Sequence, residues 1–154
     1  MSRTLYAIDP GTTHSALVIV QEGIVVGGIW TNDMLTWHLR EYEGGKHAHM
    51  VIEQIEAMGM AVGKETFETV FWSGRFAEAW DNRLRSWSRV TRRQVKLHLC
   101  GSMKAKDANI RQALIDKFGG IACTKKGGAL YGIKSHLWAA LAVAVTYQET
   151  EGKA

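Results

Sequence analysis

The sequence has little cysteine and proline and no long apolar run. Its 154 residues include one proline and two cysteines, Cys100 and Cys123, which are far apart and not in a metal-binding spacing. We therefore expect reduced thiols in a cytosolic protein rather than a disulfide framework. No apolar run approaches the ~18 residues that span a bilayer. We also expect no signal peptide, because the N-terminus has no basic segment followed by a long apolar core.

Size and composition predict a single soluble globular domain over residues 1–154, with 46% hydrophobic and 22% charged residues. The net charge of +4 is unevenly distributed. Residues 1–60 hold 3 Lys or Arg and 7 Asp or Glu, whereas residues 61–130 hold 14 and 6. A basic segment beside an acidic one is typical of a nucleic-acid surface around a carboxylate site. A solvated, charged helix face explains the charge alone about equally well.

The first apolar strand of the chain ends in a carboxylate. Residues 5–20 are typical of a strand that ends at Asp9, a tight turn through Pro10 and Gly11, and a second apolar strand. An aspartate at the end of a buried strand costs free energy unless it is paired, hydrogen-bonded or bound to a metal ion. Asp9 is therefore the first candidate for a functional site.

The hydrophobic pattern predicts an α/β protein with a mixed five-stranded sheet flanked by helices. Three strands open the chain, with a hairpin turn at Glu22 and Gly23, and helices then alternate with strands. We expect strands over about 3–9, 14–20, 24–30, 49–55 and 95–99, helices over about 34–42, 64–85, 104–118 and 135–147, and a frayed tail over 148–154.

Glu53 is a second carboxylate on an apolar strand. With a period of two, it shares a face with Val51 and Ile55, whereas Glu56 faces solvent. If this strand lies beside the first one, Glu53 and Asp9 come together near the strand ends. Two close carboxylates repel each other unless a cation lies between them, and Mg²⁺ prefers oxygen ligands. The alternative is an edge or exposed strand residue.

His136 follows Ser135, a potential helix cap, at the start of the last predicted helix. The positive end of the helix dipole favours the neutral imidazole, which is the form that binds metals. A lone histidine there is more often a surface or capping residue, but beside Asp9 and Glu53 it becomes a candidate ligand. The large apolar side chains of the 64–85 helix are interpreted as core or dimer-face residues.

Two segments of the sequence are similar to nucleotide-binding motifs. Gly59–Glu65 has three residues between its glycines and no Ser or Thr after Lys64, so it does not satisfy the P-loop pattern. The turn at residues 9–13 is also similar to the first phosphate motif of the actin and Hsp70-like ATPases. The nucleotide-binding cleft of those ATPases needs two such domains, and this chain has the length of one. An ATPase therefore stays a weak alternative.

Three segments resemble the RuvC Holliday junction resolvases: residues 7–13 (Ala-Ile-Asp-Pro-Gly-Thr-Thr), the Val-Ile-Glu strand that ends at Glu53, and residues 136–146 (His-Leu-Trp-Ala-Ala-Leu-Ala-Val-Ala-Val-Thr). Residues 58–69 and 105–116 are similar to the RuvC-type proteins of bacteriophages. The similarity runs through nearly the whole chain, in order. It implies an RNase H-like fold, a homodimer, and Mg²⁺- or Mn²⁺-dependent nicking of two strands at a DNA four-way junction.

The resemblance also implies roles for individual residues. Asp9 would bridge two metal ions, Glu53 would hold the ion on the nucleophile side, and His136 would bind the other ion or orient the water. The last helix of the family usually brings two acids three residues apart, and here those positions are His136 and Ala139, which cannot be a ligand. The fourth group stays open between water, another residue such as Asp107, and none, although Asp107 is typical of a helix-start cap. A further alternative also stays open, namely that one of these positions was altered so that the protein is inactive.

The DNA surface is expected in the basic middle segment. The residues expected to contact phosphates are Arg92, Arg93, Lys96, Lys104, Lys106, Lys125 and Lys126. The loop with Met58 and Met60 is expected to insert apolar side chains into the junction crossover, or else to pack on the dimer partner. The competing interpretations are a non-catalytic DNA-binding module and an RNase H-like nuclease on other branched DNA or on RNA–DNA hybrids. A phage-encoded protein of this kind would act in the cytoplasm of the host cell.

Overall fold

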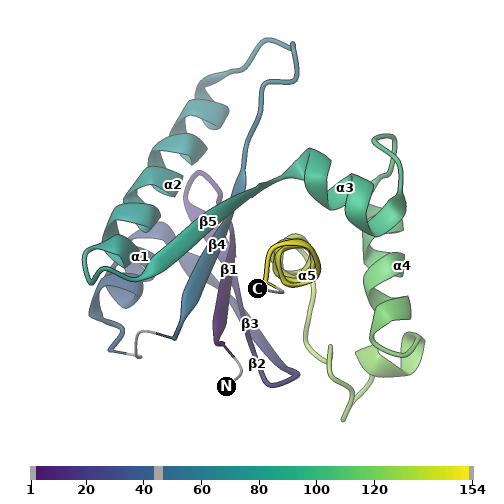
Figure 1. The fold of residues 1–154 in the computed structure, drawn as a ribbon. Coiled ribbons are helices and arrows are strands. Elements are labelled where there is room, and N and C mark those ends of the chain that lie inside the picture. The colour runs from purple at the N-terminus through teal and green to yellow at the C-terminus, as the bar shows by residue number, and fades with distance from the viewer. Residues whose placement is uncertain (1–2, 44–46, 153–154) are drawn as a thin grey trace.

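A mixed five-stranded sheet forms the centre of the protein (Figure 1). The computed structural model describes residues 3–43 and 47–152. The strand order is β3-β2-β1-β4-β5; neighbours among β1, β2 and β3 pair antiparallel, whereas β4 is parallel to both β1 and β5. The predicted mixed sheet is thus confirmed. The strands are β1 (Leu5–Asp9), β2 (His14–Gln21), β3 (Ile24–Thr31), β4 (His49–Gln54) and β5 (Ser86–Thr91).

Helices cover both faces of the sheet. One face is covered by α1 and α2, which pack on each other; α5 crosses the other face, with α3 and α4 outside it (Figure 1). Within residues 3–43 and 47–152, no helix is both long and apolar enough to cross a membrane. The helices are α1 (Asn32–Glu41), α2 (Lys64–Asp81), α3 (Arg92–Cys100), α4 (Asp107–Lys117), the 3-10 helix η1 (Ile121–Thr124) and α5 (Leu137–Thr150).

Alternation along β1 sorts its side chains between two cores. Tyr6 and Ile8 are buried against α1 and α2, whereas Leu5 and Ala7 are buried in the core that contains α5. Asp9 continues the second series by the same period of two. The first strand therefore directs its terminal carboxylate toward α5.

The helix α5 is apolar on all sides because it lies between the sheet and the outer helices. Every residue from Ala140 to Tyr147 is buried, and its small alanines allow close packing on the sheet. Near its C-terminal end, Glu149 lies 2.7 Å from the Nε2 atom of His98 in α3 and 2.8 Å from the Nζ atom of Lys117 in α4. These contacts join the C-terminal end of α5 to α3 and α4, while its N-terminal end, at His136, lies beside Asp9 at the end of β1.

The predicted strand over residues 95–99 is wrong, since these residues belong to α3. The apolar residues at 95, 97 and 99 alternate like a strand, but the helix start is encoded just before them. Thr91 accepts a hydrogen bond from the backbone N–H of Gln94, and the Gln94 side chain accepts one from the N–H of Thr91, which is a capping box. Gly101 ends the helix with a left-handed φ of 69°. The fifth strand is instead Ser86–Thr91, paired with β4.

Two predicted helix ends also differ from the structure. The helix α2 ends at Asp81 rather than at residue 85, because Leu84 takes a left-handed φ of 55° and β5 begins at Ser86. The helix α5 continues to Thr150, whose hydroxyl donates to the carbonyl of Thr146, so residues 148–150 are helical rather than frayed. The last two residues of the predicted tail, 153–154, lie outside the described residues.

Arg85 joins the end of α2 to the end of α1 from a buried position. Its guanidinium donates to the carbonyl oxygens of Tyr42 at 2.8 Å and Trp80 at 3.1 Å, and also to that of Leu39. The same group lies 4.0 Å from the ring centroid of Trp80. Because buried carbonyl groups need a donor, Arg85 is a structural cation, although its basic character alone would place it on the surface.

We expect Arg85→Met to lower the free energy of unfolding by about 3 kcal/mol, because each buried carbonyl left without a donor costs about 1–3 kcal/mol. The measurement is urea unfolding followed by tryptophan fluorescence. The matched control is Arg83→Met, since Arg83 donates to one surface carbonyl, that of Arg40, at 3.0 Å. Equal effects of the two substitutions would contradict a structural role specific to Arg85.

Candidate functional site

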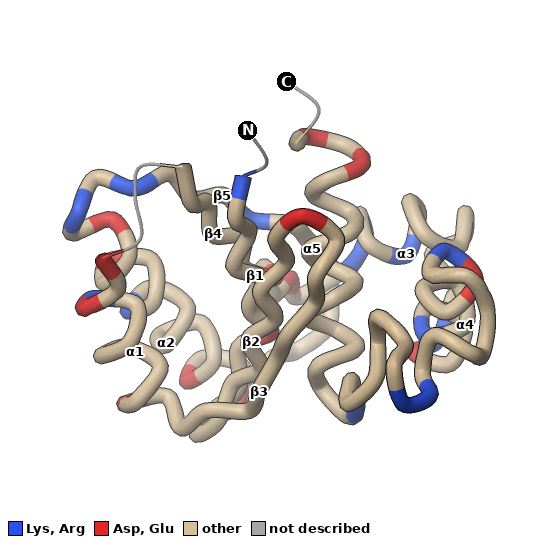
Figure 2. The backbone as a smooth tube through the Cα atoms, turned by 90° about the horizontal axis from the view of Figure 1, so that it is seen from below, with Lys and Arg blue, Asp and Glu red and all other residues tan. Residues whose placement is uncertain are grey.

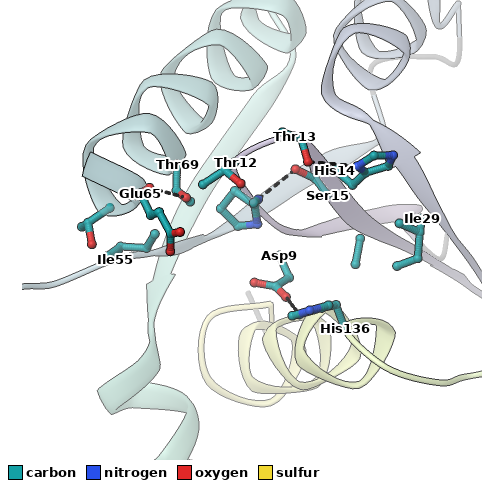
Figure 3. Close-up of a pocket in the computed structure, with 14 residues that line it drawn as sticks. Asp9, Thr12, Thr13, His14, Ser15, Ile29, Ile55, Glu65, Thr69 and His136 are labelled. Atoms are coloured by element: carbon teal, nitrogen blue, oxygen red, sulfur yellow. Dashed lines mark hydrogen bonds and ion pairs between the residues drawn. The ribbon is translucent and has the colours of Figure 1, made fainter. Parts of the chain in front are cut away.

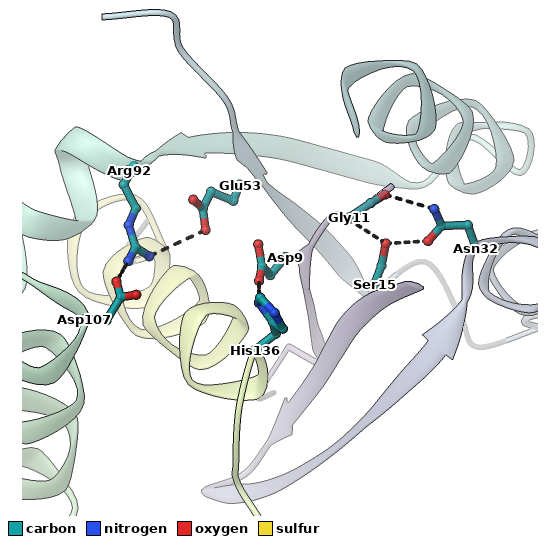
Figure 4. Close-up of polar contacts among 8 residues, drawn as sticks. All are labelled: Asp9, Gly11, Ser15, Asn32, Glu53, Arg92, Asp107 and His136. Carbon is teal, nitrogen blue, oxygen red and sulfur yellow. Dashed lines mark hydrogen bonds and ion pairs between the residues drawn. The ribbon is translucent and has the colours of Figure 1, made fainter. Parts of the chain in front are cut away.

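Two carboxylates leave the sheet side by side at the ends of β1 and β4. The strands are parallel, with Ile8 opposite Ile52, so Asp9 and Glu53 are the next residues along neighbouring strands (Figure 4). Their side chains are only 17% and 12% exposed. The fourth strand does lie beside the first, which is the condition for the two predicted acids to meet, and the pairing brings them together on the α5 face.

His136 reaches the same place from the opposite layer. Its Nδ1 atom lies 3.3 Å from Oδ2 of Asp9, and its side chain is 77% exposed (Figure 4). The predicted Ser135 cap is wrong: His136 is itself the N-cap residue, without a side-chain hydrogen bond to the helix, and Ser135 takes a left-handed φ of 51°. The imidazole is therefore free of a capping role and open to solvent beside Asp9.

The turn after Asp9 is held by a buried polar network that sequence reasoning missed. Ser15 donates to Oδ1 of Asn32 at 2.6 Å and accepts from the N–H of Gly11 at 3.0 Å, while the Asn32 amide donates to the carbonyl of Gly11 at 2.9 Å (Figure 4). A Cβ on Gly11 would lie 2.2 Å from the carbonyl oxygen of His14, so only glycine fits. The signal available in the sequence was a serine at an apolar strand position and an asparagine at a helix start.

The acid pair is electrostatically unsatisfied. Burial, and then the charge of Asp9, raise the pKa of Glu53 to about 7, while Arg92 opposes this rise. Burial also raises the pKa of Asp9, and the nearby His136 lowers it. The Oε2 atom of Glu53 is buried without a hydrogen-bond partner. One oxygen of these two buried carboxylates has no hydrogen-bond partner. A cation that prefers oxygen ligands would therefore stabilise the site.

Arg92, for which a contact with DNA phosphates stays a prediction, lies at the acid pair. Its Nη1 atom is 4.0 Å from Oε2 of Glu53, and its guanidinium also pairs with Asp107 (Figure 4). The interpretation of Asp107 as a helix cap is wrong, because Lys106 is the N-cap of α4 and Asp107 is its first helical residue. A cavity of about 270 Å³ beside these residues is also lined by His136 and Ala139.

A second cavity, of about 600 Å³, lies on the other side of Asp9 and His136 (Figure 3). It is lined by the turn at residues 10–15 and by the first turns of α2, including Glu65 and Thr69. The hydroxyls and backbone groups of the turn face this space. His136 lines both cavities, whereas Asp9 lines the larger one.

The remaining basic residues predicted to bind DNA lie on α3, in the α3–α4 connection and after η1, and Figure 2 shows Lys and Arg on the α3–α4 side. Arg93 contacts the Sδ atom of Met58 at 3.5 Å, which joins the loop after β4 to the start of α3. Met58 is 50% and Met60 is 74% exposed. The other residues of this group are half-buried or exposed: Lys96, Lys104, Lys106, Lys125 and Lys126.

The structure does not assemble a complete metal site from the predicted ligands. In the part of the chain that the structure describes, no three His, Cys, Asp or Glu side chains meet closely enough to hold a metal ion as they stand. Asp9 contacts His136, and Glu53 lies beside Asp9 with Arg92 as its nearest cation. The residues fit a divalent cation through the unpartnered oxygen of Glu53, but the set needs water or a further side chain to complete it.

We expect Glu53→Gln to stabilise the protein at pH 8 in EDTA by up to about 3 kcal/mol, the free energy of a shift from 4.5 to about 7. Since the folded pKa of Glu53 is raised, its stabilising contribution is present below pH 4.5 and is lost as the pH rises through 7. The gain from glutamine therefore shrinks toward pH 5. Urea unfolding at both pH values measures this, with exposed Glu56→Gln as the control; a less stable Glu53→Gln protein at pH 8 would contradict it.

The chain matches no protein-family model and no curated protein. Solved structures match nearly all of it. The Thermus thermophilus RuvC structure has a TM-score of 0.72 at 17% identity, covering 97% of this chain and 96% of that chain. T. thermophilus RuvC in complex with Holliday junction substrate has a TM-score of 0.70 at 20% identity, covering 94% and 92%. The chain therefore has the RuvC-type, RNase H-like fold, a mixed five-stranded sheet flanked by helices.

Proposed function

We propose that the protein is a metal-dependent, structure-selective DNA endonuclease that resolves Holliday four-way junctions by paired nicks. The observation that carries the proposal is the pair Asp9 and Glu53, buried side by side with an oxygen of Glu53 that has no hydrogen-bond partner. This pair lies at an open edge of a fold shared with RuvC, one structure of which is a complex with Holliday junction substrate.

The proposed cofactor is Mg²⁺ or Mn²⁺, with two ions expected. Asp9, Glu53 and His136 would hold them: the carboxylates supply the oxygens that these ions prefer, and the imidazole lies 3.3 Å from Asp9. When bound, such ions supply Lewis-acid activation at phosphorus and of the attacking water. Within the chain, the sheet fixes the two carboxylates, and the exposed His136 faces the side from which a DNA strand can approach.

DNA binding is proposed for the basic residues around the acid pair. Arg93 and Lys96 lie on α3, which begins beside Glu53, and Lys104 and Lys106 precede α4. Their charges would attract phosphates toward the site, because each contact releases counterions from the DNA. The full proposed set is Arg92, Arg93, Lys96, Lys104, Lys106, Lys125 and Lys126, with Met58 and Met60 as the apolar side chains that enter the crossover.

A homodimer is proposed because paired nicks require two sites. Phe67, Val70 and Phe71 follow one face of α2 and are 66%, 50% and 59% exposed. Gly74 continues that face with open space around it. Large exposed apolar side chains at helical spacing are typical of a protein interface, and a second copy of this chain is the proposed partner.

The finer classification is also proposed. Residues 58–69 and 105–116 support the bacteriophage branch of RuvC-type proteins, and residues 1–154 would form one nuclease domain. The first of these segments leads from Glu53 into α2, and the second leads into α4 at Asp107. A phage-encoded resolvase would act on DNA in the cytoplasm of the host cell.

We expect Asp9→Asn to abolish junction cleavage, by at least about a hundredfold, while leaving junction binding intact, because the substitution removes a ligand charge without removing the fold. The measurement is cleavage of a synthetic four-way junction with Mg²⁺ or Mn²⁺, beside gel-shift binding. The control is Asp33→Asn, an exposed aspartate in α1. Unchanged cutting by Asp9→Asn would remove Asp9 from the site. A wild-type protein that binds duplex and junction equally and cuts neither would refute the resolvase proposal.

We expect Phe71→Glu to convert the dimer into a monomer that nicks junctions without resolving them in pairs. The glutamate places a charge in the apolar α2 face, and Phe71 is exposed in the single chain, so the fold should survive. Sedimentation and product analysis on a plasmid-borne cruciform measure the two effects. Ile24→Glu, at the far end of the sheet, is the matched control with 66% exposure of the original side chain. A dimeric Phe71→Glu protein would exclude this face as the interface.

A further inference from the structure

The proposed metal site has too few oxygen ligands. Asp9 and Glu53 provide carboxylates, but the third group, His136, provides a nitrogen, and magnesium prefers oxygen ligands. One turn of α5 further on, Ala139 lines the cavity of about 270 Å³ beside His136 and offers no donor. A further oxygen ligand must therefore come from outside α5.

Asp107 is the carboxylate on the opposite wall of this cavity. Its side chain pairs with Arg92, whose Nη1 atom is 4.0 Å from Oε2 of Glu53 (Figure 4). Asp107 and Glu53 thus share one cation, and the charge of Asp107 acts on both Glu53 and Asp9. The side chain of Asp107 is 89% exposed, so packing does not fix its position.

The other acids near the site are less well placed. Glu65 lies on α2 and lines the larger cavity together with Asp9 and His136. The charges that act on the pKa of Asp9 and of Glu53, however, include that of Asp107 and not that of Glu65. Glu56 is exposed beyond the end of β4, and Asp116 is at the far end of α4, where it accepts from Gln112 at 2.9 Å. Ala139, whose side chain is small, lines the same cavity as Asp107.

We infer that Asp107 supplies the third carboxylate of the metal site and that Arg92 is the cation it exchanges for the divalent ion. This inference rests on the proposed nuclease function. The carboxylates of Asp9, Glu53 and Asp107 are then the ligand set, and the guanidinium of Arg92, which pairs with Glu53 and Asp107, takes the place of the ion. Arg92, once released, is available for a DNA phosphate at the same site.

The test is Mn²⁺ binding by isothermal titration calorimetry, which does not depend on cleavage. Asp107→Asn is expected to weaken Mn²⁺ binding at least about tenfold. Arg92→Gln is expected to keep or tighten binding, because it removes a competing cation. The decisive protein is the double variant: Asp107→Asn made in the Arg92→Gln background must still weaken binding about tenfold. If it has no effect there, Asp107 only holds Arg92 and the inference is overturned.

Two further proteins control the experiment. Asp116→Asn removes the same charge from the same helix and is expected to bind Mn²⁺ as the wild type does; an equal loss there would show a general charge effect and overturn the inference. Ala139→Asp, added to Asp107→Asn, is expected to restore affinity by supplying a carboxylate to the same cavity. Failure of the proposed function looks different, since the wild type itself would then bind no Mn²⁺ and cut no junction.

Discussion

The structure depends on one electrostatic constraint, the burial of two adjacent carboxylates on the α5 face of the sheet. Asp9 and Glu53 come from parallel neighbours, so their separation is fixed by the strand spacing and cannot relax by backbone movement. Burial and mutual repulsion raise the pKa of Glu53 to about 7. Two side chains from the helix starts lie against that pair: His136 against Asp9, and Arg92 against Glu53.

The two acids could each be predicted from the sequence because the signal for each is local: Asp9 ends an apolar strand and Glu53 interrupts one. Their meeting depends on the fourth strand lying beside the first, which the structure shows. The groups that surround the pair could not be predicted in the same way. Arg92 looked like one basic residue among many, and its place at Glu53 follows from the capping box at Thr91, which starts α3 directly at the sheet edge.

The same capping box explains the main error in the predicted fold. The apolar residues within 95–99 alternate with the period of a strand. Part of their spacing, however, fits a short amphipathic helix equally well. Two local signals decide between them, namely the Thr91–Gln94 box and the left-handed Gly101. The fifth strand is Ser86–Thr91, and it is rich in polar residues because it lies at the edge of the sheet. A search for apolar runs therefore does not find it.

The site combines a rigid half with an adjustable one. The turn after Asp9 is held by the buried Ser15–Asn32 network, and Glu53 lies in a paired strand, so both carboxylates are positioned before any ligand binds. His136 and Arg92 belong to helix starts in the other layer and are far more exposed. In the proposed function, the fixed acids would hold the cation, and the helix starts would adapt to the substrate. This division explains why the acid pair is already assembled while the complete ligand set is not.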